Sequence, residues 1–166
     1  MTNSAQLQQL LSTLTLEKVQ AETYRRSLKA FTKAAWPTIE PGVEYQDNWH
    51  LDAISEHLQA VVEGDIRHLI INVPPRHSKS ISVAVALPAW TWARDPSKKF
   101  LYASYANSLS IRDGTKCRRL IDSPWYQAHF GDKFKLTDDQ NQKQRFENDK
   151  SGYRISTSVG GALTGD

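Results

Sequence analysis

The sequence predicts an α/β fold in which helices flank a sheet of parallel strands. Two short apolar segments, at 68–73 and 100–105, have the length and composition of buried strands, and a helical pattern follows each of them. Strands that alternate with helices favour a parallel sheet, because a parallel connection needs a crossover that is usually a helix. The chain has 166 residues, of which 39% are hydrophobic and 23% charged, so it suits one domain with a sizeable core.

Helical spacing of leucines predicts a long helix over residues 4–35. This helix is expected either to form an N-terminal arm or to pack on the core. Residues 36–42 contain Trp-Pro and end in Gly42, which is typical of a linker or turn. We therefore expect residues 1–42 to form a helical arm with its linker, and residues 43–166 to form the main domain.

A second helix is expected over residues 49–63, because Leu51, Ile54, Leu58 and Val61 share one helical face. Asp47 or Asn48 can cap its start and Gly64 can end it. The remaining expected elements are a helix at 79–93 that Pro88 kinks, a strand at 100–105, a helix at about 107–121, a short helix from Ser123-Pro124, and a hairpin of two short strands at 145–148 and 153–158.

The segment 68–80 points to a phosphate-binding loop. Its apolar run breaks at Pro74-Pro75, and Arg-His-Ser-Lys-Ser then leads into the next helical segment. In such a loop the Lys at the helix start reaches the β- and γ-phosphates, and the hydroxyl after it holds Mg²⁺. Free N–H groups at the helix start and the positive end of the helix dipole also attract phosphate. This layout predicts that the protein binds a nucleoside triphosphate.

The loop departs from the usual pattern G-x-x-x-x-G-K-[ST] at both glycines. Val73 and Ser78 occupy these two positions. Ser78 is small enough for a close backbone approach, although a left-handed conformation costs more there than for glycine. The alternative interpretation is a basic loop that follows a core strand and has no ligand.

Charge and cysteine content exclude some classes of protein. The formal charge of +3 and the pI of about 9.0 are compatible with nucleic-acid binding and equally with an ordinary surface. The single cysteine, Cys117, excludes an internal disulfide framework and a multi-cysteine metal site, and it fits a reducing cytoplasm. No apolar window of about 18 residues predicts a membrane span, and the N-terminus lacks a secretory signal. The Gly-rich end at 157–166 suggests a truncated chain.

Several segments together resemble the large terminase subunit of tailed bacteriophages. The match covers about residue 43 to the end, through segments 48–61, 69–80 with its Pro-Pro-Arg-His-Ser-Lys-Ser wording, 100–113, 145–150 and 157–165. The resemblance implies a P-loop NTPase-like fold of the ASCE type, incomplete at the C-terminus. It implies the ATPase part of a DNA-packaging motor that uses ATP and Mg²⁺ in the cytoplasm of the bacterial host cell.

The resemblance also implies partners and roles for individual residues. The partners would be double-stranded DNA, the portal protein, the small terminase subunit and further copies in a ring. Lys79 would contact the β- and γ-phosphates, Ser80 would ligate Mg²⁺, and Arg76 would stabilise the γ-phosphate, so Arg76 and Lys79 are the catalytic candidates. The residues expected to bind the nucleotide are Pro75, Arg76, His77, Ser78, Lys79 and Ser80 around the phosphates, with Gln46 and Trp49 at the adenine.

The basic cluster at 112–119 and the histidines have simpler interpretations. Arg112, Lys116, Arg118 and Arg119 could contact DNA or a neighbouring subunit's nucleotide, but a solvated helix face is favoured. The histidines are not spaced as metal ligands and are expected at the surface or at helix caps. The loop at 160–165 resembles a family segment that links nucleotide state to DNA grip, and otherwise it is a connecting loop.

The acidic strand that a P-loop ATPase needs is not found after residue 80. Asp138-Asp139 follows only Leu136-Thr137, which is too short and too polar to be that strand. The nuclease carboxylates that the family carries are also missing, so we expect the chain alone to hydrolyse little or no ATP and to cut no DNA. Two alternatives stay open: another P-loop translocase or helicase-like ATPase, and a non-catalytic prophage remnant.

Overall fold

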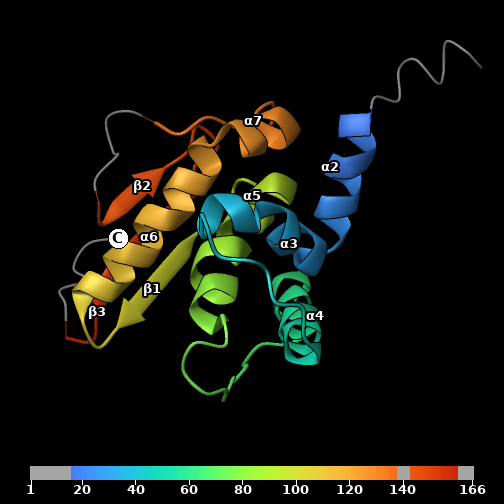
Figure 1. Cartoon of the computed structure of the whole chain (residues 1–166). Helices are drawn as coiled ribbons and strands as arrows, with labels where there is room; N and C mark the ends of the chain where they lie inside the picture. The colour runs from blue at the N-terminus through green and yellow to red at the C-terminus, as the bar shows by residue number, and fades with distance from the viewer. Residues whose placement is uncertain (1–15, 138–142, 161–166) are drawn as a thin grey trace, which may run out of the picture.

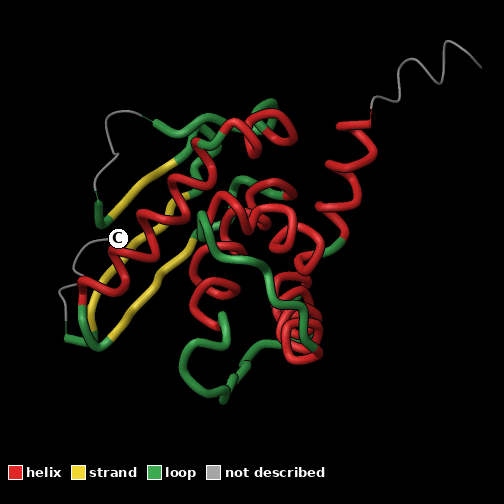
Figure 2. The backbone as a smooth tube through the Cα atoms, viewed as in Figure 1, coloured by secondary structure: helices red, strands yellow, loops and turns green. Residues whose placement is uncertain are grey.

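The computed structural model describes residues 16–137 and 143–160. In this part the chain is an α/β structure with six α-helices, one π-helix and a small mixed sheet of three strands (Figures 1 and 2). The elements in chain order are α2 (Leu16–Arg26), α3 (Leu28–Ile39), α4 (Trp49–Glu63), the π-helix η1 (Ile81–Ala86), α5 (Leu87–Arg94), β1 (Phe100–Ser104), α6 (Asn107–Asp122), α7 (Pro124–Phe130), β2 (Arg145–Glu147) and β3 (Tyr153–Ser158).

The sheet has the order β1-β3-β2. Strands β1 and β3 are parallel, with Phe100 opposite Arg154, although the sequence predicted 153–158 only as part of a hairpin, so the predicted all-parallel sheet is in fact a mixed one. Strands β2 and β3 are antiparallel and form the predicted hairpin. In the hairpin turn the Asn148 side-chain oxygen accepts the N–H of Gly152 at 3.0 Å, and a side chain at Gly152 would collide with the carbonyl of Pro96. This turn therefore needs glycine for space.

Helices cover one face of the sheet, and the opposite face is partly exposed at β1. Helix α6 packs along β1 and β3, as Figure 1 shows. On the opposite face Leu101 is 53% exposed. Side chains of a strand alternate between the two faces, so the half-buried Phe100 and Tyr102 lie on the helix side.

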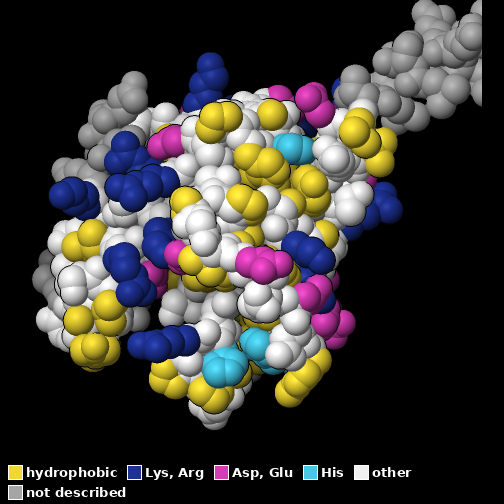
Figure 3. All heavy atoms as spheres, viewed as in Figure 1, with side chains coloured by type: hydrophobic (Ala, Val, Ile, Leu, Met, Phe, Trp, Pro, Cys, Tyr) yellow, Lys and Arg dark blue, Asp and Glu magenta, His cyan; other side chains and the backbone are white. Residues whose placement is uncertain are grey.

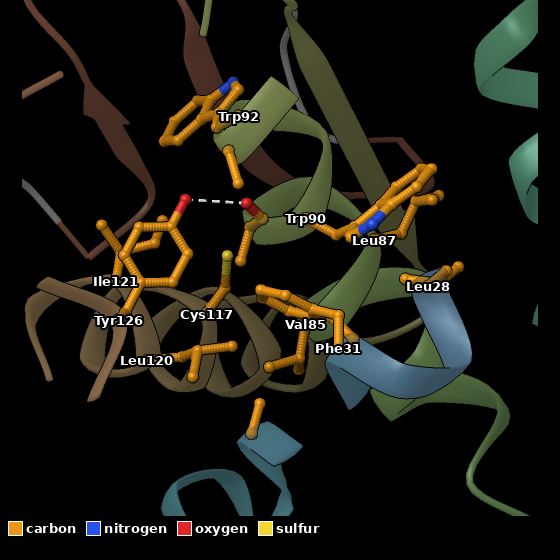
Figure 4. Packing of buried hydrophobic residues seen from close by; sticks show 14 of the residues in the cluster. Leu28, Phe31, Val85, Leu87, Trp90, Trp92, Cys117, Leu120, Ile121 and Tyr126 are labelled. Atoms are coloured by element: carbon orange, nitrogen blue, oxygen red, sulfur yellow. Dashed lines mark hydrogen bonds between the residues drawn. The ribbon is translucent and has the colours of Figure 1, made fainter. Parts of the chain in front are cut away.

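The core lies among helices α3, α5, α6 and α7 (Figure 4). Phe31 of α3 is fully buried and meets the ring of Trp125 at 5.4 Å between centroids. The hydroxyl of the buried Tyr126 donates to the carbonyl of Ala89 at 2.8 Å. Burial raises the pKa of the Cys117 thiol to about 12, so this thiol is a small apolar core group at neutral pH.

The predicted helix over 4–35 is wrong as one continuous element. Its first residues lie outside the described part of the chain, and the rest forms α2 and α3, which meet at Ser27. The Ser27 hydroxyl accepts the N–H of Ala30 at 3.1 Å and so starts a new helix. Helix α3 then runs through Pro37 to Ile39, where a linker was predicted, because Trp36 and Ile39 are buried in the core. Of the two interpretations, the helix packed on the core describes α3.

Helix α4 occupies the predicted residues 49–63 and ends at Gly64, whose φ of 92° requires the left-handed conformation that glycine allows. Its start differs from the prediction. Asn48 is the first residue of the turn, but its side chain makes no capping hydrogen bond. The Asp47 carboxylate instead forms an ion pair with the Lys29 ammonium, at 2.8 Å.

The predicted strand at 68–73 is absent. This segment is outside any sheet, although Leu69, Ile71 and Val73 are half-buried while Ile70 is 85% exposed. A groove of about 460 Å³ separates Leu69 and Ile71 from β1. A strand exists only where a neighbour accepts its backbone hydrogen bonds, and in the described residues no strand lies in this groove.

The predicted helix over 79–93 is confirmed as helical, but it is not uniformly α-helical. Helical conformation begins at Lys79 and continues to Arg94. Where a kink at Pro88 was predicted, the structure has the π-helix η1 directly before α5. The other elements match their predictions to within about two residues, a usual difference at element ends.

Candidate phosphate-binding site

The loop between residues 74 and 80 has an unusual backbone. Arg76 and Ser78 have positive φ angles of 67° and 56°. Ser78 is the residue that stands at the second glycine position of the phosphate-loop pattern. A left-handed conformation costs a residue with a side chain about 1–2 kcal/mol. Ser78 keeps this conformation because the path of the surrounding backbone imposes it. The glycine is missing from the sequence, but residue 78 has the positive φ that glycine adopts readily.

The loop leads directly into the N-terminus of a helix. The first N–H bonded inside this helix is that of Ser82, which donates to the carbonyl of Ser78 at 2.9 Å. In the described part of the chain, the N–H groups from Ser78 to Ile81 have no backbone acceptor. These groups and the positive end of the helix dipole are suited to an anion.

A cavity of about 540 Å³ opens in front of the loop. This volume lies in the range of small-ligand sites. Three parts of the chain form it: the loop, the C-terminal end of α3 with the residues just after it, and the middle of α6. The lining residues are Val73 to Ile81, with Trp36, Glu40, Val43, Arg112, Asp113 and Lys116.

Positive charge dominates the cavity. Arg76 and Lys79 are exposed, and within the described residues neither has an ion-pair partner. Lys116 pairs with Glu40, and Arg112 pairs with its neighbour Asp113 at 2.8 Å. Figure 3 shows Lys and Arg side chains gathered along α6. The two unpaired cations therefore lie on the loop itself.

The structure brings together all six residues that the sequence predicts around the phosphates. Pro75, Arg76, His77, Ser78, Lys79 and Ser80 line this one cavity. It does not bring the predicted adenine-binding residues to the same cavity. Gln46 is exposed and Trp49 is 78% exposed, and neither lines it. The Trp49 ring lies 6.3 Å from that of His50, which in turn lies 5.4 Å from that of His77 in the loop.

Sequence reasoning missed the contributions of α3 and α6. Trp36 and Val43 give the cavity an apolar wall, and the Trp36 indole donates to the Val43 carbonyl at 2.9 Å. Arg112 and Lys116, which the sequence favoured as a solvated face, also line the cavity. Their spacing of four residues places them on one helical face, which was the available signal.

A second cavity of about 340 Å³ lies behind the loop. Lys79, Ser80 and Asp113 line both cavities. The second cavity also reaches Tyr102 of β1 and the fully buried Arg154 of β3. The start of the helix after the loop therefore faces the ligand-sized cavity on one side and the sheet on the other.

The described residues of the site provide few side-chain ligands for a metal ion in the absence of a nucleotide. Within residues 16–137 and 143–160, no three His, Cys, Asp or Glu side chains are grouped as metal ligands. The exposed Ser80 hydroxyl is the oxygen that the sequence assigns to Mg²⁺. Mg²⁺ commonly binds through few protein oxygens together with phosphates and water, so one hydroxyl fits a metal that arrives with a triphosphate.

Comparisons of the chain with protein-family models, with curated proteins and with solved structures find no match. Within the described residues, no helix combines the length and the apolar composition that crossing a membrane requires.

Proposed function

We propose that this chain binds Mg²⁺–ATP at the loop 74–80 and is part of the ATPase of a large terminase subunit, a phage DNA-packaging motor. The observation that carries the proposal is the loop itself. Ser78 adopts the conformation of the missing glycine, and the unpaired cations Arg76 and Lys79 stand at the start of a helix beside a cavity of ligand size. Each feature suits a phosphate chain.

The proposal includes a P-loop NTPase-like fold of the ASCE type. Three features support it: the loop precedes a helix, β1 and β3 are parallel, and β1 has an unpaired edge toward residues 69–73 within the described chain. The groove between this edge and Leu69 has apolar walls that include Val83 and Leu87. A further strand in this groove would pair with β1 on one side and with residues 69–73 on the other.

Each residue of the site has a distinct task in binding. The N–H groups of the loop and of the first helical turn would hold phosphate oxygens. Lys79 would neutralise the β- and γ-phosphates, and Arg76 would add charge at the terminal phosphate. Arg112 would supply a further cation from α6, once its pair with Asp113 rearranges. The metal, bound to Ser80, would polarise the phosphate oxygens.

We propose that this chain binds ATP but does not hydrolyse it at the rate of a motor. Hydrolysis needs a carboxylate that orients the attacking water. In the described residues, the carboxylates that line the cavity are Glu40 and Asp113, and each is already paired with a cation. Translocation, DNA cleavage, the ring, and contacts with the portal protein and the small terminase subunit are proposed for the complete motor on the resemblance alone.

The binding step can be tested by titrating the protein with Mg²⁺–ATP and following heat. Lys79→Ala removes the main cation and is expected to weaken binding at least about tenfold, or about 1.4 kcal/mol. Lys150→Ala is the matched control, since Lys150 lies in the β2–β3 turn and does not line the loop cavity. Equal binding by the wild type and Lys79→Ala would overturn the proposal.

A further inference from the structure

Pro88 has no N–H and so leaves one backbone carbonyl of the preceding helix without a donor, that of Val83 in a π register or that of Ala84 in an α register. In η1 the bonds run to the fifth residue along the chain, as when Leu87 donates its N–H to the Ser82 carbonyl. In this register the carbonyl of Val83 would accept from residue 88, and in an α-helix that of Ala84 would do so. Residue 88 is Pro, which has no N–H, so neither bond can form.

Side chains from two strands donate to these two carbonyls. The Tyr102 hydroxyl of β1 donates to the Val83 carbonyl at 2.8 Å. The Arg154 guanidinium of β3 donates to the Ala84 carbonyl at 3.1 Å. The same guanidinium lies over the Tyr102 ring, 4.4 Å from its centroid, so the two donors support each other.

The Arg154 side chain lies in a buried site formed by Ser156 and Gly114. The residue is fully buried, and its guanidinium donates to the Ser156 hydroxyl at 2.6 Å. Gly114 of α6 makes room, because a Cβ atom there would lie 2.4 Å from an Arg154 nitrogen. Among the described residues no carboxylate pairs with Arg154, and its Nε has no hydrogen-bond partner. A buried guanidinium without an ion pair is costly, and an apolar side chain would fill the space at lower cost.

We propose that Tyr102 and Arg154 are positioning residues of the phosphate loop. They replace the donor that Pro88 lacks, keep η1 in its π register and so fix the direction in which Lys79 and Ser80 face. The register matters because a π turn holds an extra residue, and its loss would rotate the residues before it by about 100° relative to α5. The proposal rests on the proposed function, since it concerns how the same site is oriented.

Two variants separate positioning from stability. Tyr102→Phe keeps the ring over Arg154 and removes only the hydroxyl donor, and it is expected to speed amide exchange in η1 and to weaken Mg²⁺–ATP binding about tenfold. Pro88→Ala restores an N–H at residue 88 and allows the α register. The change also removes part of a fully buried ring, so some stability is lost. Binding is expected to weaken about tenfold at a temperature where the variant is still fully folded. A merely structural role would not lower the affinity of a variant that is still fully folded in the assay.

Matched controls make the result decisive. Tyr105→Phe removes a hydroxyl from a side chain that is 85% exposed, and Pro124→Ala removes the exposed proline at the start of α7. Both are expected to bind as the wild type does. If Lys79→Ala loses binding while Tyr102→Phe and Pro88→Ala keep it, the positioning proposal is overturned and the nucleotide site stands. If Lys79→Ala binds as well as the wild type, both proposals fail.

Discussion

The helical core and the phosphate loop use their side chains and backbone in opposite ways. In the core, Phe31, Trp90 and Tyr126 are fully buried, and the polar ends of Trp90 and Tyr126 are bonded to carbonyls. In the loop, Arg76 and Lys79 are exposed and unpaired within the described chain, and Ser78 has a left-handed backbone. The contrast teaches that the core provides the stability and that the loop keeps its groups available for a ligand.

The core and the loop are expected to differ most in how much a truncated side chain lowers the free energy of unfolding. Phe31→Ala removes a ring that packs against Trp125, Tyr126 and Phe130, and it is expected to lower the free energy of unfolding by about 3–5 kcal/mol. His77→Ala in the loop should change it by less than about 0.5 kcal/mol, because His77 is exposed. Urea unfolding measures both. Similar losses for the two variants would contradict the division between core and loop.

An alkaline titration sharpens the same contrast. Burial raises the pKa of Cys117 to about 12 from its ordinary value of about 9, and it raises the pKa of Tyr102 and Tyr126 as well. The unfolded thiol loses its proton above about pH 9 while the folded thiol keeps it, so the stability from this group is complete below pH 9 and falls as pH rises from 9 to 12. The expected slope is about 1.4 kcal/mol per pH unit for each such group.

The alkaline effect is measured as urea unfolding at pH 8, 9 and 10. Cys117→Ala removes one of the three groups and is expected to flatten the fall in unfolding free energy between pH 9 and 10. The native Cys117 thiol should also resist a thiol-labelling reagent until the protein unfolds, because it is fully buried. Rapid labelling of the native protein would show that the core is open.

A smaller difference than that of Phe31→Ala is expected in the loop backbone. Glycine adopts the φ of 56° at residue 78 without strain, so Ser78→Gly should be more stable than Ser78→Ala by about 1 kcal/mol. The order should reverse at Ser158 in β3, where glycine weakens a strand. Thermal unfolding of the four variants gives the comparison. The same order at both positions would mean that residue 78 has no left-handed demand.

Much of the fold could be predicted from local patterns. The bounds of α4 and α6, the strand β1 and the β2–β3 hairpin follow from apolar spacing, Gly64 and the turn at 149–152, all of which act over a few residues. The absent strand at 69–73 could not be predicted, because an apolar run does not show whether a neighbouring strand is there to pair with it. The break at Ser27 was also hidden, since Ser is common inside helices as well as at their caps.

In the candidate site, too, residues that are contiguous in sequence could be predicted and residues brought together by packing could not. Residues 75–80 are contiguous, so the sequence could identify them together as one site. Trp36 and Arg112 come from elements distant in sequence, and only the packing of α3 and α6 brings them to the loop. The π register of η1 depends on Tyr102 and Arg154, whose partners lie 19 and 70 residues away in the chain, so no local pattern could reveal it.

The most direct test of the central claim is a comparison of ATP, ADP and AMP, each with Mg²⁺, by amide chemical-shift mapping. Affinity is expected to fall in that order, because the loop binds phosphates. The largest shifts are expected from Arg76 to Ile81 and should disappear in Lys79→Ala. Equal affinity for the three nucleotides, or shifts that persist in Lys79→Ala, would contradict the claim that this loop is a triphosphate site.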